Sequence, residues 1–167
     1  TLGGGFGQST LGTNQHFEIN NSNTNQSYEV PNPPEDTISQ IAWSPVQNHL
    51  VASSWDGSVR IWEVQTQGGQ CAAAAKFMYK HQAPALCCCF SLDGISVFSG
   101  GCDNTVIMKN LQTQQETPIG KHDAPVCYVG VIPGNLIVSG SWDKTIRFWN
   151  GQAQTPVATI QCPERIY

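Results

Sequence analysis

A strand–turn–strand pattern that occurs three times is the feature that most constrains how this chain folds. Its clearest copy is SGSWDKTIRFWN, residues 139–150, in which Asp143 and Lys144 form the turn and apolar and polar residues alternate after it. Similar copies are SSWDGSVRIWEV, residues 53–64, and the weaker GGCDNTVIMKNL, residues 100–111. Repetition at this scale predicts a chain built from equivalent structural units.

The spacing of the repeats indicates which unit this is. The turn aspartates Asp56, Asp103 and Asp143 are 47 and 40 residues apart, and His81 and His122 precede the second and third by 22 and 21 residues. A period near 40 with these markers is typical of four-stranded propeller blades. The chain therefore resembles WD-repeat β-propellers, an all-β fold class, and we expect about three blades of a longer propeller of seven blades.

The resemblance divides the chain into a tail and successive blades. The tail is rich in Gly, Asn, Ser, Thr and Gln and poor in aliphatic residues, so it is expected to be disordered. It contains one Phe-Gly pair, Phe6-Gly7. Because a propeller needs about four blades to close, we interpret the chain as the N-terminal part of a longer protein, although a short protein remains an alternative. The expected segments are the tail (1–31), blade one (32–80), blade two (81–121), blade three (122–161) and the start of a fourth blade (162–167).

Alternation and turn residues predict the strands within each blade. Segment 73–78 also has helical propensity, but the repeat favours an outer strand there. The expected strands are 38–43, 50–54, 58–64 and 73–78 in blade one, 85–90, 95–99, 105–109 and 116–119 in blade two, 126–131, 135–139, 145–149 and 156–160 in blade three, and a further strand from Ile166.

Composition excludes several classes of function. Charged residues make up 12% of the chain and the formal net charge is −4, so there is no electrostatic argument for direct binding to nucleic acid. The seven cysteines include three in succession, residues 87–89, but no C-x-x-C pair. They predict reduced thiols packed in cores rather than a metal site. We expect no cofactor, no metal, no small-molecule substrate and no membrane span.

A polar constellation in blade three has two interpretations. Ser139, His122 and Asp143 could form a catalytic triad. In the WD-repeat family, however, the matching residues and the third-strand tryptophan hydrogen-bond in a row, which satisfies buried polar groups. Repetition favours this structural network, since an enzyme needs one triad, and we expect no enzymatic activity. The candidate network residues are His122, Ser139, Asp143 and Trp149 in blade three, His81, Ser99 and Asp103 in blade two, and Asp56 and Trp62 in blade one.

Two positions depart from the family pattern. Lys109 replaces the third-strand tryptophan of blade two, and Pro34 stands where the other blades have histidine. We therefore expect incomplete networks and lower rigidity in blades one and two.

Two tryptophans remain that the fold does not require. Trp55 and Trp142 each directly precede a turn aspartate, where blade two has Cys102. Exposed aromatic residues on one face of a propeller suggest a protein-binding surface, although each could instead pack on a neighbouring loop. The other candidate contact residues are charged and lie in nearby loops: Asp36, Lys121, Asp123 and Lys144.

Longer motifs point to one branch of the family. The segments PPEDTIS, ASSWDGSVRIWEVQ, KHDAPV, SGSWDKTIRFWN and PERIY resemble the branch that contains the mRNA export propeller of the nuclear pore and its sister, the mitotic-checkpoint propeller. The resemblance implies a non-enzymatic protein that binds a GLEBS-type hairpin of an FG-repeat nucleoporin, with Trp55 and Trp142 on the binding face. It also implies a role in mRNA export and a location in the nucleus and at the nuclear pore or envelope, with shuttling to the cytoplasm. Any contact with RNA would then be made only within the assembled complex.

Two alternatives remain open at this point. The chain could be a spindle-checkpoint propeller that binds the same kind of motif in checkpoint kinases. It could also be a scaffold or substrate-recognition propeller of another complex, because a fold does not fix a function.

Overall fold

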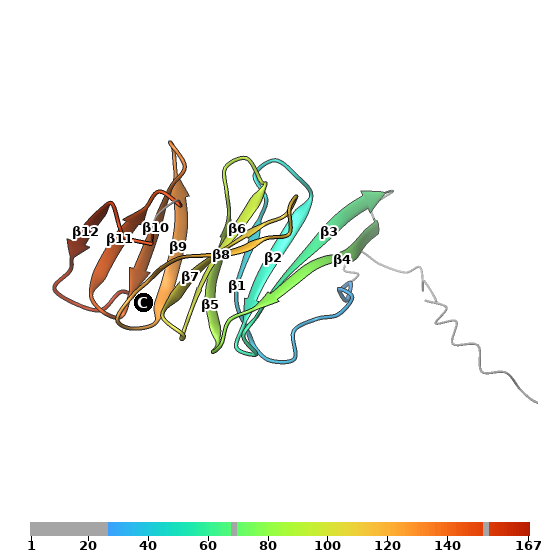
Figure 1. The fold of residues 1–167 in the computed structure, drawn as a ribbon. Helices are drawn as coiled ribbons and strands as arrows, with labels where there is room; N and C mark the ends of the chain where they lie inside the picture. The colour runs from blue at the N-terminus through green and yellow to red at the C-terminus, as the bar shows by residue number, and fades with distance from the viewer. Residues whose placement is uncertain (1–26, 68–69, 152–153) are drawn as a thin grey trace, which may run out of the picture.

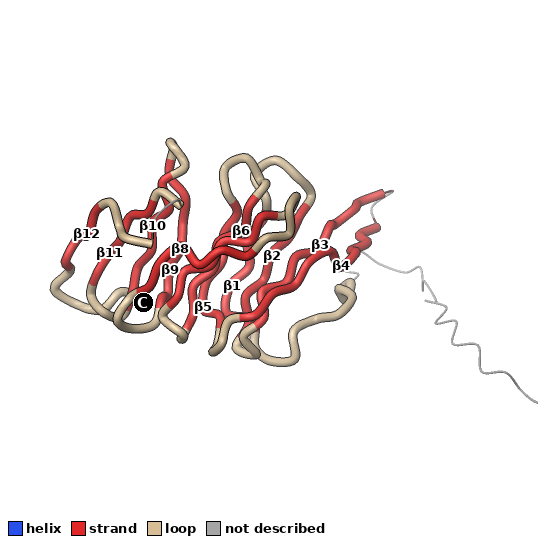
Figure 2. The backbone as a smooth tube through the Cα atoms, viewed as in Figure 1, coloured by secondary structure: helices blue, strands red, loops and turns tan. Residues whose placement is uncertain are grey.

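The structure is a computed structural model that describes residues 27–67, 70–151 and 154–167. The predicted tail falls largely outside these residues, including its Phe-Gly pair. The described chain forms three four-stranded antiparallel sheets that stand side by side (Figure 1), and Figure 2 shows them joined by short loops. The strands are β1 (Ile38–Trp43), β2 (His49–Ser54), β3 (Ser58–Gln67) and β4 (Gln70–Lys80) in the first sheet, β5 (Ala85–Phe90), β6 (Ser96–Gly101), β7 (Thr105–Asn110) and β8 (Glu116–Lys121) in the second, and β9 (Val126–Ile132), β10 (Leu136–Ser141), β11 (Thr145–Trp149) and β12 (Ala158–Gln161) in the third.

Each sheet consists of consecutive strands, in the orders β1-β2-β3-β4, β5-β6-β7-β8 and β9-β10-β11-β12. This arrangement confirms the predicted all-β class with four-stranded blades. Segment 73–78 lies in strand β4, as the repeat favoured, but β3 and β4 are longer than predicted and stay paired out to Gln67 and Gln70. The last strand, β12, begins at Ala158, two residues later than expected, and Ile166 is not in a strand.

The turns between second and third strands share one construction. The residue after the aspartate has a positive φ, of 82° at Gly57, 67° at Asn104 and 68° at Lys144. The aspartate also accepts a hydrogen bond from the backbone N–H two residues later, which holds the tight turn closed. These bonds run from Ser58 to Asp56 (2.7 Å), from Thr105 to Asp103 (3.0 Å) and from Thr145 to Asp143 (2.9 Å).

The hydrophobic cores lie between neighbouring sheets rather than within them. Side chains of the first sheet such as Val51 and Ile61 pack against Phe90 and Val97 of the second. The second core joins β6 and β7 to the third sheet in the same way, and it includes the fully buried Trp149. Because each blade buries one face against the next, stacking supplies the stability that one sheet lacks.

The cysteines lie mostly in or beside these cores, and all seven are free. Cys87 and Cys88 are 0% exposed. Burial raises the pKa of Cys88 to about 11, so its thiol stays protonated and acts as a small apolar group.

The described residues contain no group of three or more His, Cys, Asp or Glu side chains that could hold a metal ion. They also include no helix with the length and hydropathy of a membrane-crossing segment.

Candidate protein-binding face

One face of the molecule carries the three turns of this repeated construction and the links between sheets. The backbone N–H of His81 donates to the Gly57 carbonyl at 2.9 Å, and that of His122 donates to the Asn104 carbonyl at 2.8 Å. These bonds place each link directly on the turn of the preceding sheet, along the lower edge of Figure 1. We call the surface formed by the β2–β3, β6–β7 and β10–β11 turns and these links the turn face.

The same bond occurs once more beyond the third sheet. The backbone N–H of Cys162 donates to the Lys144 carbonyl at 2.7 Å, and the Ile166 N–H donates to the Ser141 carbonyl at 3.3 Å. Cys162 therefore occupies the place that His81 and His122 hold in the earlier links. A cysteine here cannot bridge an aspartate and a serine as an imidazole does.

Four side chains form a continuous hydrogen-bonded row in the third sheet. His122 Nδ1 lies 2.8 Å from an Asp143 carboxylate oxygen, and its Nε2 lies 2.7 Å from Ser139 Oγ. The Trp149 indole N–H donates to the same Ser139 Oγ at 2.8 Å. If the His122 imidazole carries its proton on Nδ1, that N–H donates to Asp143 and Nε2 accepts a hydrogen bond from the Ser139 hydroxyl. Every member of the row then has a hydrogen-bond partner.

The electrostatics of this row suit a structural role. Burial lowers the pKa of His122 although Asp143 opposes the shift, so the imidazole is neutral near pH 7. Burial alone would raise the pKa of Asp143, but hydrogen bonds from Thr145, Asp123 and His122 hold it well below its usual range. Ser139 is 0% exposed, so its hydroxyl is not presented to a substrate.

The second sheet corrects the expectation of an incomplete network. His81 bonds Asp103 at 2.9 Å and Ser99 at 2.8 Å, and Ser99 Oγ accepts a further bond at 2.8 Å from the Tyr79 hydroxyl. Tyr79 belongs to β4 of the first sheet, so a phenol from the neighbouring sheet replaces the missing indole. Lys109 instead turns to Glu116, with its Nζ 3.0 Å from a carboxylate oxygen.

Replacing Tyr79 with phenylalanine is therefore expected to destabilise the protein by about 1 kcal/mol, because a buried hydrogen bond is lost while the ring still fills the core. Thermal and urea unfolding of the whole protein would measure the change. Tyr128→Phe is the matched control, since Tyr128 is 51% exposed and its variant should unfold like the wild type. Equal stability of the two variants would show that the Tyr79–Ser99 bond contributes nothing.

The first sheet satisfies its network groups from the backbone of the N-terminal segment. The Trp62 indole N–H donates to the Pro31 carbonyl at 2.7 Å, and the Glu35 N–H donates to Asp56 at 2.9 Å. Burial alone would raise the pKa of Asp56, but hydrogen bonds from Ser58 and Glu35 hold it at about 2. Segment 31–35 thus takes the place of the missing histidine.

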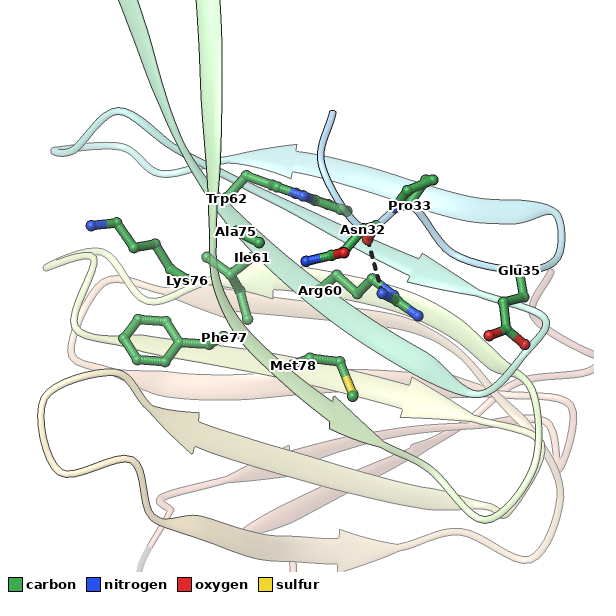
Figure 3. Close-up of a pocket in the computed structure, with 10 residues that line it drawn as sticks. All are labelled: Asn32, Pro33, Glu35, Arg60, Ile61, Trp62, Ala75, Lys76, Phe77 and Met78. Atoms are coloured by element: carbon green, nitrogen blue, oxygen red, sulfur yellow. Dashed lines mark hydrogen bonds between the residues drawn. The ribbon is translucent and has the colours of Figure 1, made fainter. Parts of the chain in front are cut away.

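This segment also forms one wall of a shallow groove, which Figure 3 shows in close-up. Arg60 reaches across from β3 and donates to the Asn32 carbonyl at 2.8 Å. The opposite wall is strand β4, including Lys76, Phe77 and Met78, and the groove holds about 440 Å³.

The two candidate tryptophans differ in their surroundings. Trp55 is 48% exposed at its turn, and its backbone N–H donates to the Thr37 carbonyl at 2.9 Å. Trp142 is half-buried, with its ring centroid 6.2 Å from that of Tyr167. Its indole N–H is buried and has no hydrogen-bond partner among the described residues. The turn between them, on the second sheet, carries the half-buried Cys102.

The candidate charged residues fall into two groups. Asp36 is exposed in the segment just ahead of β1, and Lys121 is exposed at the end of β8. Asp123, whose side chain is 86% exposed, pairs with Arg147 at 2.9 Å. Lys144 lies 3.7 Å from a carboxylate oxygen of Glu164. These pairs place charge of both signs on the turn face that also carries Trp142.

Sequence reasoning missed the role of Arg147. Its guanidinium contacts Asp123 at 2.9 Å, Asp143 at 3.3 Å and the Lys121 carbonyl at 2.7 Å, so it organises the charged part of the turn face. Arg60 holds the equivalent position in the first sheet. An arginine four residues after the turn aspartate, in VRIW and IRFW, was the available signal.

Comparison with known proteins identifies the repeat. The profile of the family described as "WD domain, G-beta repeat" matches residues 26–63, 74–108 and 116–150. This chain belongs to the WD40 repeat family. The three WD40 matches correspond to the three repeated units of the sequence.

Individual WD40 relatives carry more specific names. The chain is 39% identical over 168 residues to the "Poly(A)+ RNA export protein" of Schizosaccharomyces pombe, covering 97% of this chain and 46% of the relative. It is 39% identical over 170 residues to the "mRNA export factor" of Xenopus tropicalis, covering 98% and 45%. It is 40% identical over 144 residues to the "WD40 repeat protein poxJ" of Penicillium oxalicum, covering 83% and 41%. The chain thus spans less than half the length of these relatives.

Proposed function

We propose that this chain is the partner-binding part of a WD40 propeller that acts in mRNA export from the nucleus. Its turn face would dock a GLEBS-type hairpin of an FG-repeat nucleoporin. The observation that carries the proposal is the pair Trp55 and Trp142, which occupy equivalent turn positions on one face of a rigid scaffold. Relatives named as mRNA export proteins support the biological setting.

The chemistry of the turn face suits a peptide with apolar anchors and accessible backbone groups. Trp55 offers a large exposed ring, and aromatic side chains of this kind often dominate binding energy. The indole N–H of Trp142 is buried and has no hydrogen-bond partner among the described residues, so a carbonyl of the bound segment would satisfy it once the ring is displaced from its buried position. An unmade bond at a buried donor costs about 1–3 kcal/mol, which would favour the complex.

The charges around Trp142 would set orientation more than affinity. The exposed Asp123 pairs with the partly buried Arg147, and Lys144 pairs with Glu164. Such pairs at the rim of an interface chiefly affect specificity and association rate. Asp36, ahead of β1, and Lys121, at the end of β8, would extend this rim.

Contact with RNA would come through the assembled complex. The net charge of −4 gives this chain no excess of cations to neutralise phosphates. We place the protein in the nucleus and at the nuclear pore, with shuttling to the cytoplasm.

Titration of the whole protein with a synthetic GLEBS-type hairpin peptide tests the proposal. We expect saturable one-to-one binding by calorimetry and none with a scrambled peptide of the same composition. In cells, depletion should cause poly(A)+ RNA to accumulate in the nucleus. Absence of hairpin binding would overturn the docking proposal, and normal RNA export with failed mitotic arrest would favour the checkpoint alternative.

A scaffold role is the second candidate, since one similar relative is named only as a WD40 repeat protein. In that case the turn face would bind a different partner. Failure to bind the hairpin together with unchanged RNA export would favour this role.

A further inference from the structure

A second binding feature lies at the opposite end of the strands from the turn face. A cavity of about 210 Å³ opens at the seam between the second and third sheets. It lies where β5 ends and β6 begins, and where β9 ends and β10 begins. Its lining includes Asp93, Phe98, Met108, Val131, Asn135 and Ile137. We call it the acidic seam pocket.

The floor of this pocket is apolar and its rim is polar. Phe98 and Ile137 are buried core residues, and Met108 and Val131 pack against the same core. Asp93 and Asn135 are exposed and come from the β5–β6 and β9–β10 loops. The volume suits one long side chain, because a water molecule occupies roughly 30 Å³ and the pocket would hold about seven of them.

Asp93 supplies the only charged side chain among the residues that line the pocket. Its Oδ1 accepts hydrogen bonds from the Ser91 hydroxyl at 2.5 Å and from the Ile95 N–H at 3.0 Å. The bond from Ser91 lowers the pKa of Asp93, so the carboxylate is ionised near pH 7. Both of these hydrogen bonds end on Oδ1, which leaves Oδ2 as an acceptor for a ligand.

The equivalent cavity at the first seam has different chemistry. It holds about 230 Å³ and is lined by Lys76, His49 and the apolar Phe77 and Leu111, with no carboxylate in its lining. The acidic character is therefore specific to the second seam and does not follow from the fold alone.

We propose that the acidic seam pocket binds an arginine or lysine side chain of a partner protein. The aliphatic stem would lie on Met108, Phe98 and Val131, and the cationic head would meet the Asp93 carboxylate at the rim. Long basic side chains combine these two needs in one group, and a charge-assisted hydrogen bond to a carboxylate is among the stronger kinds. The site lies away from the turn face and does not depend on the function proposed above.

Methionine labelling gives a direct readout. The chain has two methionines. Met108 lines the acidic seam pocket, and Met78 lines the shallow groove between segment 31–35 and β4. The whole protein, labelled with 13C-methyl methionine and assigned through Met108→Leu, would be titrated with N-acetyl-arginine amide. We expect a saturable shift of the Met108 methyl signal and no saturable shift of Met78.

Two controls separate charge recognition from general packing. N-acetyl-citrulline amide has nearly the same shape without the charge and should bind at least fivefold more weakly. Asp93→Asn keeps an oxygen for Ser91 and Ile95, so it should retain the fold and weaken arginine binding by a similar factor, whereas Glu29→Gln, at an exposed carboxylate, should not. Equal binding of citrulline, unchanged binding to Asp93→Asn, or an unresponsive Met108 would each overturn the proposal.

Discussion

Replacing Trp149 with alanine is expected to destabilise the protein by about 3–5 kcal/mol. Trp149 is 0% exposed, and its indole N–H completes the row through Ser139. Its ring lies directly on the backbone at Gly120, where an added Cβ would stand 2.1 Å from a ring carbon. The substitution would therefore open a cavity in the second core and remove a buried hydrogen bond. Thermal and urea unfolding of the whole protein measure the loss.

Two comparisons make this result specific. Trp55→Ala makes the same chemical change at a side chain that is 48% exposed, and it should change stability by less than about 1 kcal/mol. Trp149→Phe keeps much of the ring volume and should fall between the wild type and Trp149→Ala. If Trp149→Ala unfolds like Trp55→Ala, the core position assigned to Trp149 is wrong.

Replacing both Trp55 and Trp142 with alanine is expected to abolish binding of the hairpin peptide at concentrations that saturate the wild type. If each residue is an energetic anchor worth about 2 kcal/mol or more, each single variant should weaken binding about 30-fold. Calorimetry or fluorescence anisotropy with the whole protein measures these constants.

The matched control for the pair is Trp43→Ala. Trp43 is 57% exposed and ends β1, away from the turn face. This variant should bind the hairpin as the wild type does. Equal binding by the double variant and by Trp43→Ala would exclude the turn face as the docking surface.

The blades could be predicted from the sequence because the repeated residues determine local structure, namely the turns and the strands beside them. An aspartate followed by Gly, Asn or Lys closes each turn, and alternation defines the strands on either side. For this reason β1, β5 and β11 begin and end where the pattern placed them. The extension of β3 and β4 was missed because residues 65–72 alternate poorly and include two glycines.

Contacts between sheets were harder to predict than contacts within one. Tyr79 is the penultimate residue of β4, the outer strand of the first sheet, so a comparison of repeats position by position did not place it beside Ser99. The aromatic ring that contacts Trp142, that of Tyr167, likewise lies outside the third sheet. Such contacts depend on how two sheets pack, and the periodicity of one strand does not report this.

The order of the strands has a consequence for how the chain acquires its structure. Every sheet is built from strands that are adjacent in sequence, so its pairings close short loops at a low entropic cost. Folding is typically faster when contacts are local. Each four-stranded sheet could therefore form soon after its last strand leaves the ribosome. The hydrogen bond from Tyr79 to Ser99 joins the first and second sheets, so it can form only after both sheets have formed. Packing of complete sheets against one another is therefore expected to be a late step of folding.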